Sequence, residues 1–453
     1  MSNAEVAAVV LAAGMGTRMK SGLPKVLHPI AGRAMVLHVL AAAAALDPAK
    51  SVVVVGPDMD QVAKTVAPHR TVIQHERLGT ADAVKAAREA LADFRRGTVL
   101  VLFGDTPMIT SATLRRMLDA RAAGASVAVL GFRPEDPSGY GRLLQDGKGK
   151  LAAIVEDRDA TEEQRAIGLC NSGVMAIDAA RLFSLVDRVG KNNARGEFYL
   201  TDIIGLACAD GLDCAVVEAD ADELMGVDSR AALARAEAAW QKARRRRAMD
   251  EGATLLDPDS VWFSYDTKLG SDVVVGPNVF FGPGVTVEDH VEILSFCHFH
   301  TATIERGAIV GPFARLRPGA VIGRNAHVGN FVEVKNAVLG EGAKANHLSY
   351  IGDTDVGAKT NIGAGTITCN YDGYLKHRTV IGKSAFIGSN TAIVAPVTIG
   401  DGAVIGAGST VVRDVPADAL TIARGEQVDL PGRAKALREK LEQQKRAQKK
   451  DEG

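Results

Sequence analysis

Residues 8–25 read A-V-V-L-A-A-G-M-G-T-R-M-K-S-G-L-P-K, an apolar run that ends in a glycine-rich turn followed by cations. The run Val6–Leu11 is typical of a central parallel strand that is buried on both faces. The glycines allow a sharp turn whose N–H groups point at an anion, and Arg18 and Lys25 add positive charge. This stretch therefore predicts a phosphate-binding loop at the end of a strand in an α/β fold.

Two common glycine motifs do not fit the loop. The P-loop pattern G-x-x-x-x-G-K-[ST] is absent, and the dinucleotide pattern G-x-G-x-x-G begins at Gly14 but has Met19 in place of its third glycine. The stretch from Leu11 to Lys25 instead resembles the signature L-x-x-G-x-G-x-R-x-x-x-x-x-P-K of nucleotidyltransferases that activate sugar 1-phosphates. The alternative is a plain strand-to-helix turn with solvated charges.

Composition narrows the class of protein. The 453 residues are enough for two or three domains. Lys+Arg 53 against Asp+Glu 54 gives a net charge of -1, which does not favour binding to nucleic acid or to a membrane surface. No apolar run approaches the ~20 residues that span a bilayer. Five scattered cysteines without C-x-x-C spacing indicate free thiols in a reducing cytoplasm.

The first half alternates apolar strands with alanine-rich helices up to about residue 228, which predicts an α/β domain with a mainly parallel sheet. The expected strands are 51–55, 99–103, 126–131 and 151–155, and the expected helices are 35–46, 81–94 and 112–123. Residues 229–250 lack proline and are rich in Ala and Arg, which predicts a helical linker. Its Arg244–Arg247 cluster is interpreted as a solvated helix face rather than a nucleic-acid patch.

The second half, residues 251–430, has a period of six. One series of apolar positions runs from Val279 to Ile309 and another from Ile381 to Val411, both in six-residue steps, which is typical of a parallel β-helix. The pattern resembles the left-handed β-helix of hexapeptide acyltransferases, and the left hand follows from that resemblance. A polar insertion, N-Y-D-G-Y-L-K-H at 370–377, interrupts the coils, and a basic tail, 431–453, predicts a frayed helix or disorder.

Several further segments make the resemblance closer. They are V-I-Q-H-E-R-L-G-T-A-D-A, S-G-Y-G-R, I-V-E-D-R-D-A-T, C-N-S-G-V-M and G-E-F-Y-L-T-D-I-I in the first half, and G-P-F-A-R-L-R-P-G, G-N-F-V-E-V-K and N-I-G-A-G-T-I-T-C-N-Y-D-G in the second. With them, the chain resembles the bacterial family of bifunctional N-acetylglucosamine-1-phosphate uridylyltransferases/glucosamine-1-phosphate acetyltransferases along nearly its whole length. The resemblance implies a Rossmann-like nucleotidyltransferase domain, 1–228, followed by a left-handed β-helix.

For the first half, the resemblance implies a site for UTP and N-acetylglucosamine 1-phosphate. The residues implied to bind them are Leu11, Ala12, Ala13, Gly14, Lys25, Gln74, Gly79, Thr80, Phe103, Gly104, Gly141, Glu156 and Asn171. The attacking sugar phosphate is already an anion, so the reaction needs positioning and charge stabilisation rather than a strong base. Arg18 and Lys25 are the catalytic cations that we expect to supply it.

Two carboxylates are candidate Mg²⁺ ligands. Asp105 ends the apolar strand V-L-V-L-F-G-D, where open α/β sheets bind ligands, and Asp228 follows in L-M-G-V-D. Mg²⁺ prefers one or two such oxygens together with phosphate oxygens. The family usually has asparagine at the position of Asp228, and since both residues offer an oxygen, we expect metal binding to be kept or tightened.

The second half needs a base, because an ammonium group cannot attack a thioester before it loses a proton. Histidine suits this role near neutral pH, and His347, His298 and His300 are all candidates by spacing. The resemblance selects His347 as the general base. It also implies that glucosamine 1-phosphate is bound by Arg317, Lys335, Tyr350 and Asn361, and acetyl-CoA by Ala364, Asn370, Tyr371, Ser389, Ala407 and Arg424.

The resemblance thus implies two reactions in one chain: acetyl transfer to glucosamine 1-phosphate, then uridylyl transfer from UTP to the product, giving UDP-N-acetylglucosamine for peptidoglycan and lipopolysaccharide synthesis. The resemblance also implies a homotrimer formed through the β-helix. Two alternatives remain at this point. One is a single-activity sugar nucleotidyltransferase whose β-helix serves only assembly, and the other is a non-enzymatic scaffold with the same folds.

Overall fold

The computed structural model describes residues 5–147 and 149–451, which form two compact units. The first extends to Thr267 and includes Phe281–Gly284, and the second comprises Lys268–Phe280 and the chain from Val285 onward. Among the described residues, none of the helices is both long enough and apolar enough to cross a bilayer.

A nine-stranded sheet forms the centre of the first unit, with β11-β7-β10-β6-β1-β4-β5 as its main order. Its strands are β1 (Val6–Leu11), β4 (Lys50–Val55), β5 (Arg70–Ile73), β6 (Thr98–Phe103), β7 (Val127–Phe132), β8 (Arg142–Gln145), β9 (Leu151–Val155), β10 (Cys170–Asp178) and β11 (Cys214–Glu218). The short strands β2 (Pro29–Ile30) and β3 (Arg33–Ala34) pair with each other, and β12 (Thr254–Leu255) belongs to neither of these two sheets. Along that order β10 is antiparallel to both neighbours and the other pairs are parallel, which confirms the prediction of a mainly parallel sheet.

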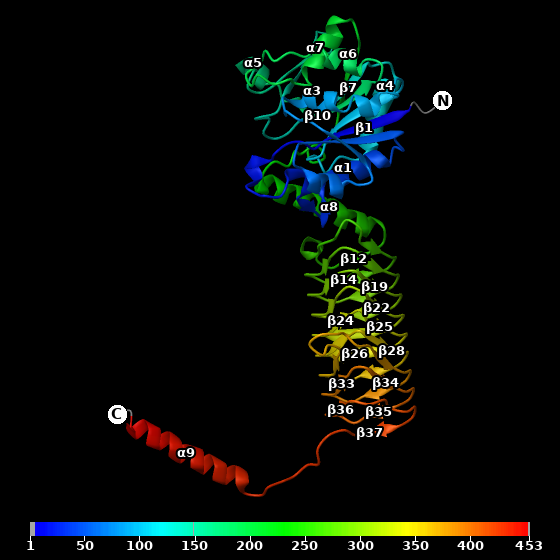
Figure 1. The fold of residues 1–453 in the computed structure, drawn as a ribbon, viewed down its shortest axis with the longest axis vertical. Helices are drawn as coiled ribbons and strands as arrows, with labels where there is room; N and C mark the ends of the chain where they lie inside the picture. The colour runs from blue at the N-terminus through cyan, green and yellow to red at the C-terminus, as the bar shows by residue number, and fades with distance from the viewer. Residues whose placement is uncertain (1–4, 148, 452–453) are drawn as a thin grey trace. The chain divides into compact units, whose positions relative to one another are not determined.

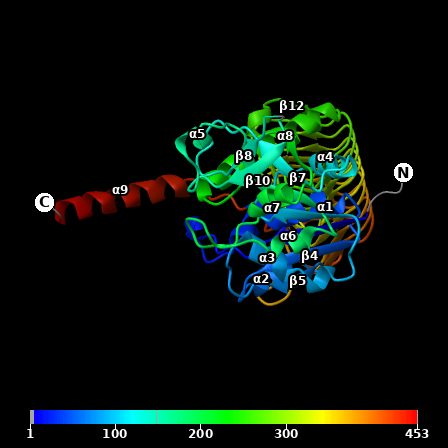
Figure 2. The ribbon, with the colours of Figure 1, turned by 90° about the horizontal axis from the view of Figure 1, so that it is seen from above.

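Helices cover both faces of this sheet (Figure 1). The helices of the first unit are α1 (Met35–Ala44), α2 (Asp60–Thr65), α3 (Thr80–Ala86), α4 (Ser111–Ala122), α5 (Glu162–Arg165), α6 (Leu182–Val186), α7 (Asp202–Ala209) and α8 (Arg230–Asp250), with single 3₁₀ turns at η1 (Thr17–Met19), η2 (Lys25–Leu27), η3 (Glu89–Leu91) and η4 (Pro258–Ser260). Because side chains alternate along a strand, Ala7 and Val9 of β1 pack with α3, α6 and α7, whereas Ala8 and Val10 pack with α1, α2 and α4. At the outer edge, β5 lies close to α2 (Figure 2).

The parallel strands bring their carboxyl ends to one edge of the sheet. Leu11 pairs with Phe103 on one side and with Val54 on the other, and Val55 pairs with Ile73. The residues that follow β1, β4, β5 and β6 therefore lie next to one another, which is where ligands bind in sheets of this type.

Two helices differ from expectation. The helix predicted over 81–94 is interrupted after α3, and the chain continues through the tighter turn η3, which lets Ala90, Leu91 and Phe94 all reach the core. The predicted connecting helix exists as α8, capped by Ser229, but it packs inside the first unit, where Ala232 and Ala236 join a buried cluster with Val227.

The second unit consists of three parallel sheets whose strands repeat coil by coil (Figure 1). One contains β14 (Val274–Val275), β17 (Glu292–Ile293), β20 (Ile309–Val310), β23 (His327–Asn330), β26 (Lys344–His347), β29 (Asn361–Ile362), β32 (Phe386–Ile387), β35 (Val404–Ile405) and β37 (Leu420–Thr421). The second contains β13 (Lys268–Leu269), β16 (Thr286–Val287), β19 (Ala302–Ile304), β22 (Ala320–Ile322), β25 (Val338–Leu339), β28 (Thr354–Val356), β31 (Thr379–Ile381) and β34 (Val397–Ile399). The third contains β15 (Phe280–Phe281), β18 (His298–Phe299), β21 (Arg315–Leu316), β24 (Glu333–Lys335), β27 (Tyr350–Gly352), β30 (Ile367–Cys369), β33 (Ala392–Val394) and β36 (Thr410–Val411).

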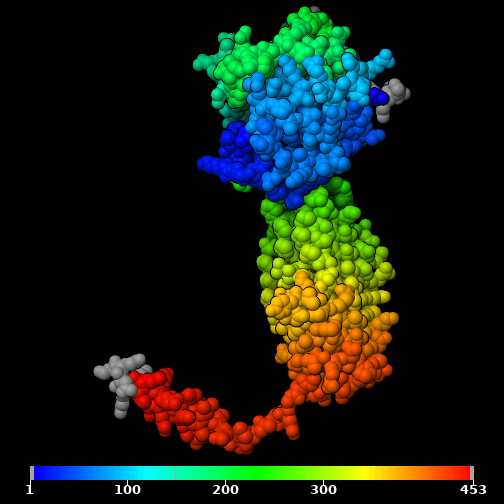
Figure 3. All heavy atoms as spheres, viewed as in Figure 1, coloured from blue at the N-terminus to red at the C-terminus, as the bar shows by residue number. Residues whose placement is uncertain are grey.

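Pairing within these sheets follows the hexapeptide period. Ile309 pairs with His327, 18 residues later, so three hexapeptides make one coil, whereas the coil from Glu292 to its partner Ile309 is one residue shorter. The predicted parallel β-helix is confirmed. The register lengthens where Asn361 pairs with Phe386, because the coil between them carries the insertion 370–377, which is coloured orange on the surface in Figure 3. The basic tail takes the helical alternative, as α9 (Arg433–Asp451).

Candidate active sites

The glycine-rich loop of the first unit depends on Gly16. Its φ of 64° is left-handed, and a Cβ placed there would lie 2.5 Å from Cβ of Lys25. Gly14 is different, because a Cβ there would have no heavy atom within 4 Å. The turn therefore requires Gly16 for its backbone, whereas Gly14 faces open space beside the strand end.

The two predicted cations pair with the two predicted metal ligands. Nζ of Lys25 lies 2.5 Å from Oδ2 of Asp105, and an Nη of Arg18 lies 2.7 Å from Oδ2 of Asp228. The two carboxylate segments are joined directly, since the Val227 N–H donates to the Asp105 carbonyl over 2.8 Å. Four residues from three distant segments of the sequence thus form one charged group at the edge of the sheet.

Beside this group lies a cavity of about 730 Å³. Its lining residues are Arg18, Thr80, Asp136, Ser138, Gly139, Tyr140, Glu156, Asp157, Arg158, Arg195, Glu197, Tyr199, Met225, Gly226, Asp228, Ala232 and Arg235. Burial raises the pKa of Tyr140, and the negative charges of Asp228 and Asp105 raise it further. The size of the cavity is typical of a small-molecule site.

One loop, between β5 and α3, contains Gln74 and Gly79, and Thr80 is the first residue of α3. The buried Gln74 amide donates to the Gly79 carbonyl at 2.9 Å and to Asp82 at 2.8 Å. Its nitrogen therefore binds neighbouring protein groups. Gly79 has a φ of 123°, and a Cβ there would lie 2.5 Å from the Phe198 carbonyl. The Thr80 hydroxyl accepts a hydrogen bond from the Leu200 N–H at 2.9 Å, which joins the loop to the segment lining the cavity.

The predicted sugar-binding residues lie on the antiparallel side of the sheet. Glu156 follows β9, lines the cavity and accepts a hydrogen bond from the Thr201 hydroxyl at 3.1 Å. Burial raises the pKa of Glu156, with that hydrogen bond opposing the shift. The Asn171 N–H donates to the Gly141 carbonyl at 2.8 Å, so these two predicted residues are neighbours.

In the second unit, His347 ends β26 and lies beside Asn330 of the preceding coil. The two residues occupy paired positions, and Nδ1 of His347 lies 2.8 Å from Oδ1 of Asn330. Because an amide oxygen can only accept, this contact assigns the proton to Nδ1. Nε2 of the exposed ring then has a free lone pair with which to take a proton.

Cations gather on the neighbouring sheet. Arg317 forms an ion pair with Glu333 at 2.7 Å, and Lys335 lies one coil further on. The ammonium of Lys376, from the inserted loop, is the main cause that lowers the pKa of Lys335, and burial adds to the effect. Burial alone would raise the pKa of Asp353, but hydrogen bonds from Asn336 and Asn370 and the nearby lysines keep it below its ordinary value.

The predicted acetyl-CoA residues form a column. Ala364, Ser389 and Ala407 follow β29, β32 and β35 at equivalent positions, and Asn390 N–H donates to the Ala364 carbonyl at 2.7 Å. Arg424 donates to the Ala407 carbonyl at 2.6 Å and so extends the column. Asn370 is buried against Asp353, whereas the Tyr371 side chain is 60% exposed.

Known proteins match each half of the chain. Residues 8–251 match the family of the MobA-like NTP transferase domain, and residues 301–336 and 378–413 match the bacterial transferase hexapeptide. The bifunctional protein GlmU of Rhodospirillum rubrum is 60% identical over 436 residues, which cover 96% of this chain and 97% of that protein. The bifunctional GlmU protein of Paramagnetospirillum magneticum is 59% identical over 440 residues, covering 97% and 98%. That of Sphingopyxis alaskensis is 54% identical over 451 residues, covering 99% and 100%.

The chain belongs to the bifunctional GlmU family. This confirms the predicted family and the predicted enzyme with two transferase activities, a nucleotidyltransferase joined to an acyltransferase. Neither the single-activity enzyme nor the non-enzymatic scaffold is favoured.

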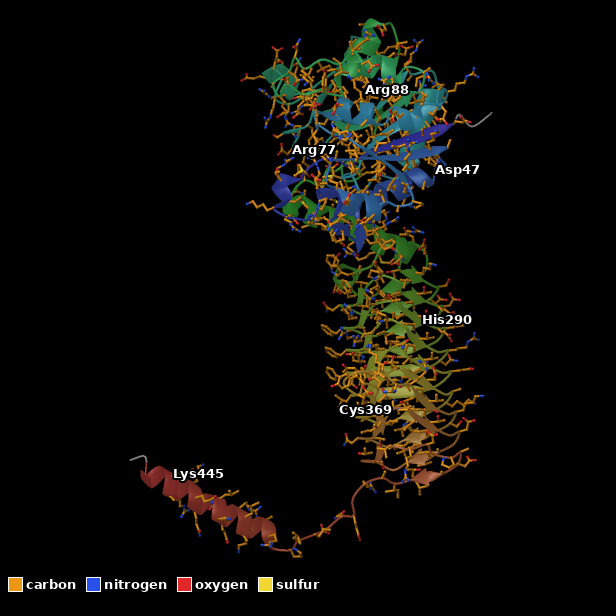
Figure 4. All side chains as sticks on the ribbon, viewed as in Figure 1. Asp47, Arg77, Arg88, His290, Cys369 and Lys445 are labelled. Atoms are coloured by element: carbon orange, nitrogen blue, oxygen red, sulfur yellow. The ribbon has the colours of Figure 1, made fainter. Side chains whose placement is uncertain are left out.

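Several side chains lie at the sites although their roles were not predicted from the sequence. Tyr140 and Asn330 both lie inside segments that carried the resemblance, S-G-Y-G-R and G-N-F-V-E-V-K. These motifs could therefore have identified both residues as part of a site. Arg77, labelled in Figure 4, donates to the Ala13 carbonyl at 2.8 Å and supports the turn after β1. Lys376 was part of the inserted loop, but only the fold brings it to Lys335.

Proposed function

We propose that the first unit transfers a uridylyl group from UTP to N-acetylglucosamine 1-phosphate and that the second transfers an acetyl group from acetyl-CoA to glucosamine 1-phosphate. The family supports two transfer reactions. The observation that carries the first assignment is the charged group of Lys25, Asp105, Arg18 and Asp228 at the carboxyl edge of the sheet.

The uridylyl site has to bring two anions together. Lys25 and Arg18 would offset negative charge at the α-phosphate, and the N–H groups of the glycine loop add further donors. The nucleotide would lie over Leu11–Gly14, where Gly14 leaves open space, with Gln74, Gly79 and Thr80 beside its base. Phe103 and Gly104 lead directly to Asp105 at this edge.

The amino sugar would occupy the 730 Å³ cavity next to the charged group. Glu156 lines this cavity, and Gly141, directly before β8, lies next to Asn171 of β10. Their oxygens and amide groups suit the hydroxyl and acetamido groups of N-acetylglucosamine.

The donors present fit Mg²⁺. Within the described residues, no cluster of three or more His, Cys, Asp or Glu side chains is placed to hold a metal. Mg²⁺ needs fewer protein ligands, since one or two carboxylates suffice when phosphate oxygens complete its coordination. Asp105 and Asp228 would hold it, and when bound it would neutralise phosphate charge.

For acetyl transfer, His347 would remove a proton from the sugar ammonium through Nε2, because Asn330 holds the ring by Nδ1. The freed amine can then attack the thioester. Arg317 and Lys335 would bind the sugar phosphate, and Lys376 adds a third cation. Tyr350 and Asn361 would complete the sugar site, since Asn361 pairs with Lys344 of β26, the strand that ends at His347.

Acetyl-CoA would lie along the column of Ala364, Ser389 and Ala407, with Arg424 facing its phosphates. Asn370 and Tyr371 would contact it from the inserted loop. Small side chains along the column allow close approach of an extended ligand, which supports this assignment.

The β-helix would also form a homotrimer. Three exposed phenylalanines, Phe296, Phe313 and Phe331, stack at one corner of the coils with centroids 4.9 and 5.1 Å apart. An exposed apolar ladder of this kind marks an interaction surface. Sedimentation velocity tests it: the wild type should sediment as a trimer and Phe313→Asp as smaller species.

We place the protein in the cytoplasm, supported by the five free cysteines. Its product, UDP-N-acetylglucosamine, would be consumed by cell-envelope synthesis. Separate assays test the two activities: purified protein with UTP, Mg²⁺ and N-acetylglucosamine 1-phosphate should release pyrophosphate, and protein with acetyl-CoA and glucosamine 1-phosphate should release free thiol. Absence of either product would refute that half of the assignment.

A further inference from the structure

The glycine-rich loop that carries Arg18 and Lys25 has few anchors of its own. Most of its residues from Gly14 to Leu23 are exposed, and Met15 is 60% exposed. Its buried side chain is Met19, which is 1% exposed. A loop with so little buried surface needs another contact to hold its two cations in a fixed place.

That contact comes from Arg230, the first residue of α8. Nε of Arg230 donates to the Met19 carbonyl at 3.2 Å. An Nη of the same guanidinium lies 3.4 Å from Nδ1 of His28, the residue that follows η2. Since a guanidinium can only donate, the His28 nitrogen accepts. One side chain thus bridges both ends of the segment that contains Arg18 and Lys25.

The surroundings of His28 allow its ring to accept a hydrogen bond from Arg230. Its side chain is buried, and burial together with the Arg230 charge lowers its pKa, which favours the neutral ring that can accept a hydrogen bond. The His28 N–H donates to the Lys25 carbonyl at 3.2 Å. The position of His28 is therefore coupled to the backbone of Lys25.

The loop in turn contacts the segment that leads into α8. Arg18 reaches from the loop to Asp228, and Arg230, two residues later, reaches back to Met19 beside Arg18. We propose that Arg230 is a positioning residue for uridylyl transfer: by binding the Met19 carbonyl and His28, it fixes the loop in the form that aligns Arg18 and Lys25 with the two carboxylates. The proposal rests on the uridylyl transfer proposed above, and Arg230 itself touches no reacting atom.

The test compares Arg230→Gln with Lys242→Gln, which removes one exposed cation from the same helix. Limited trypsin digestion read by mass spectrometry follows cleavage after Arg18 and Lys20. This readout does not depend on any activity. We expect cleavage of the loop to be at least fivefold faster in Arg230→Gln, and Lys242→Gln to match the wild type.

Kinetics give the second readout. Since misplacement of a catalytic group by about 1 Å costs on the order of 100-fold, kcat for uridylyl transfer should fall about 10- to 100-fold in Arg230→Gln, with a smaller change in KM for UTP. Acetyl transfer should be unchanged, because its proposed residues lie in the second unit, and a cooperative unfolding transition of Trp240 and Trp262 fluorescence shows that the first unit is folded. Arg230→Lys keeps a donor for the Met19 carbonyl and should recover part of both effects.

Unchanged cleavage in Arg230→Gln would overturn the anchoring role, and faster cleavage with an unchanged kcat would overturn the positioning role. If the proposed function itself failed, the wild type would release no pyrophosphate, whereas failure of the positioning role leaves the wild-type rate intact and removes only the difference between variants.

Discussion

The ammonium of Lys25 and the carboxylate of Asp105 lie 2.5 Å apart although 80 positions separate them in the sequence. Both side chains are less than one-fifth exposed, at 17% and 19%. The Arg18–Asp228 pair is more accessible, with Arg18 74% exposed. Salt therefore screens the first pair less than the second, and Lys25–Asp105 is the pair whose loss leaves an uncompensated charge.

The first prediction concerns Asp105. Asp105→Asn keeps the shape of the side chain but removes its charge, so uridylyl transfer should fall by roughly 10²–10³-fold. The first unit should lose about 1–3 kcal/mol of unfolding free energy, because Lys25 loses a charged partner. Both tryptophans, Trp240 and Trp262, lie in the first unit, so denaturation followed by tryptophan fluorescence reports on that unit alone.

Acetyl transfer provides the control for this variant, because its proposed residues all lie in the other unit. A variant that kept full uridylyl transfer would show that Asp105 is not needed for the reaction. A variant that lost both activities would contradict separate sites.

Patterns that are local in the sequence predicted most of the fold. The six-residue period predicted the coils of the β-helix, and the apolar run Val6–Leu11 with its glycine turn predicted the strand and loop that lead to the site. The helix at 229–250 was also predicted, but its location was not: alanines such as Ala232 and Ala236 indicate a helix without indicating what they pack against.

Contacts between distant segments could not be predicted from the sequence. The hexapeptide period places His347 on a coil, but only the register of neighbouring coils reveals Asn330 as its partner. Likewise, Gln74 was named for the nucleotide, whereas its amide nitrogen binds Gly79 and Asp82. A linear motif identifies a residue as part of a site and does not say whether it touches the ligand or supports the loop.

Two glycines of the same loop should respond differently to alanine. Gly16→Ala places a side chain in a left-handed position against Lys25 and should destabilise the first unit by about 1–2 kcal/mol. Gly14→Ala meets no protein atom, so stability should be kept while KM for UTP rises. Tryptophan-monitored unfolding and UTP kinetics measure the two effects, and an equal loss of stability in both variants would contradict this distinction.

Glu156 should make the stability of the first unit depend on pH. Burial raises its pKa in the folded state, so the folded protein holds this proton more tightly than the unfolded chain. Stability is then lost as pH rises from the unfolded pKa, about 4.3, through the raised folded value. Glu156→Gln removes this penalty and should unfold at a higher temperature than the wild type at pH 8, with little difference at pH 4.

The same Glu156→Gln variant should bind N-acetylglucosamine 1-phosphate more weakly, since it replaces a carboxylate in the cavity with an amide. Thr201 can still donate to the amide oxygen, so the local structure is preserved. A midpoint at pH 8 below that of the wild type would contradict the raised pKa.

Asp228 should affect the metal more than the fold. Its pair with Arg18 is exposed, and exposed pairs contribute only about 0–1 kcal/mol. Asp228→Asn should therefore leave unfolding nearly unchanged but raise the Mg²⁺ concentration needed for half-maximal uridylyl transfer, because one negative charge is lost. An unchanged Mg²⁺ requirement would remove Asp228 from the metal site.

Variants of His347 and Asn330 should differ in how much acetyl transfer they lose. His347→Ala should lose about 10²–10⁴-fold in acetyl transfer, the usual contribution of general base catalysis, and keep uridylyl transfer. Asn330→Ala leaves the imidazole in place but removes the oxygen that holds Nδ1, and one hydrogen bond of ~1 kcal/mol corresponds to about fivefold. The double variant should be no slower than His347→Ala alone, because Asn330 acts only through that ring. Additive losses in the double variant would mean that Asn330 contributes to the reaction independently of His347.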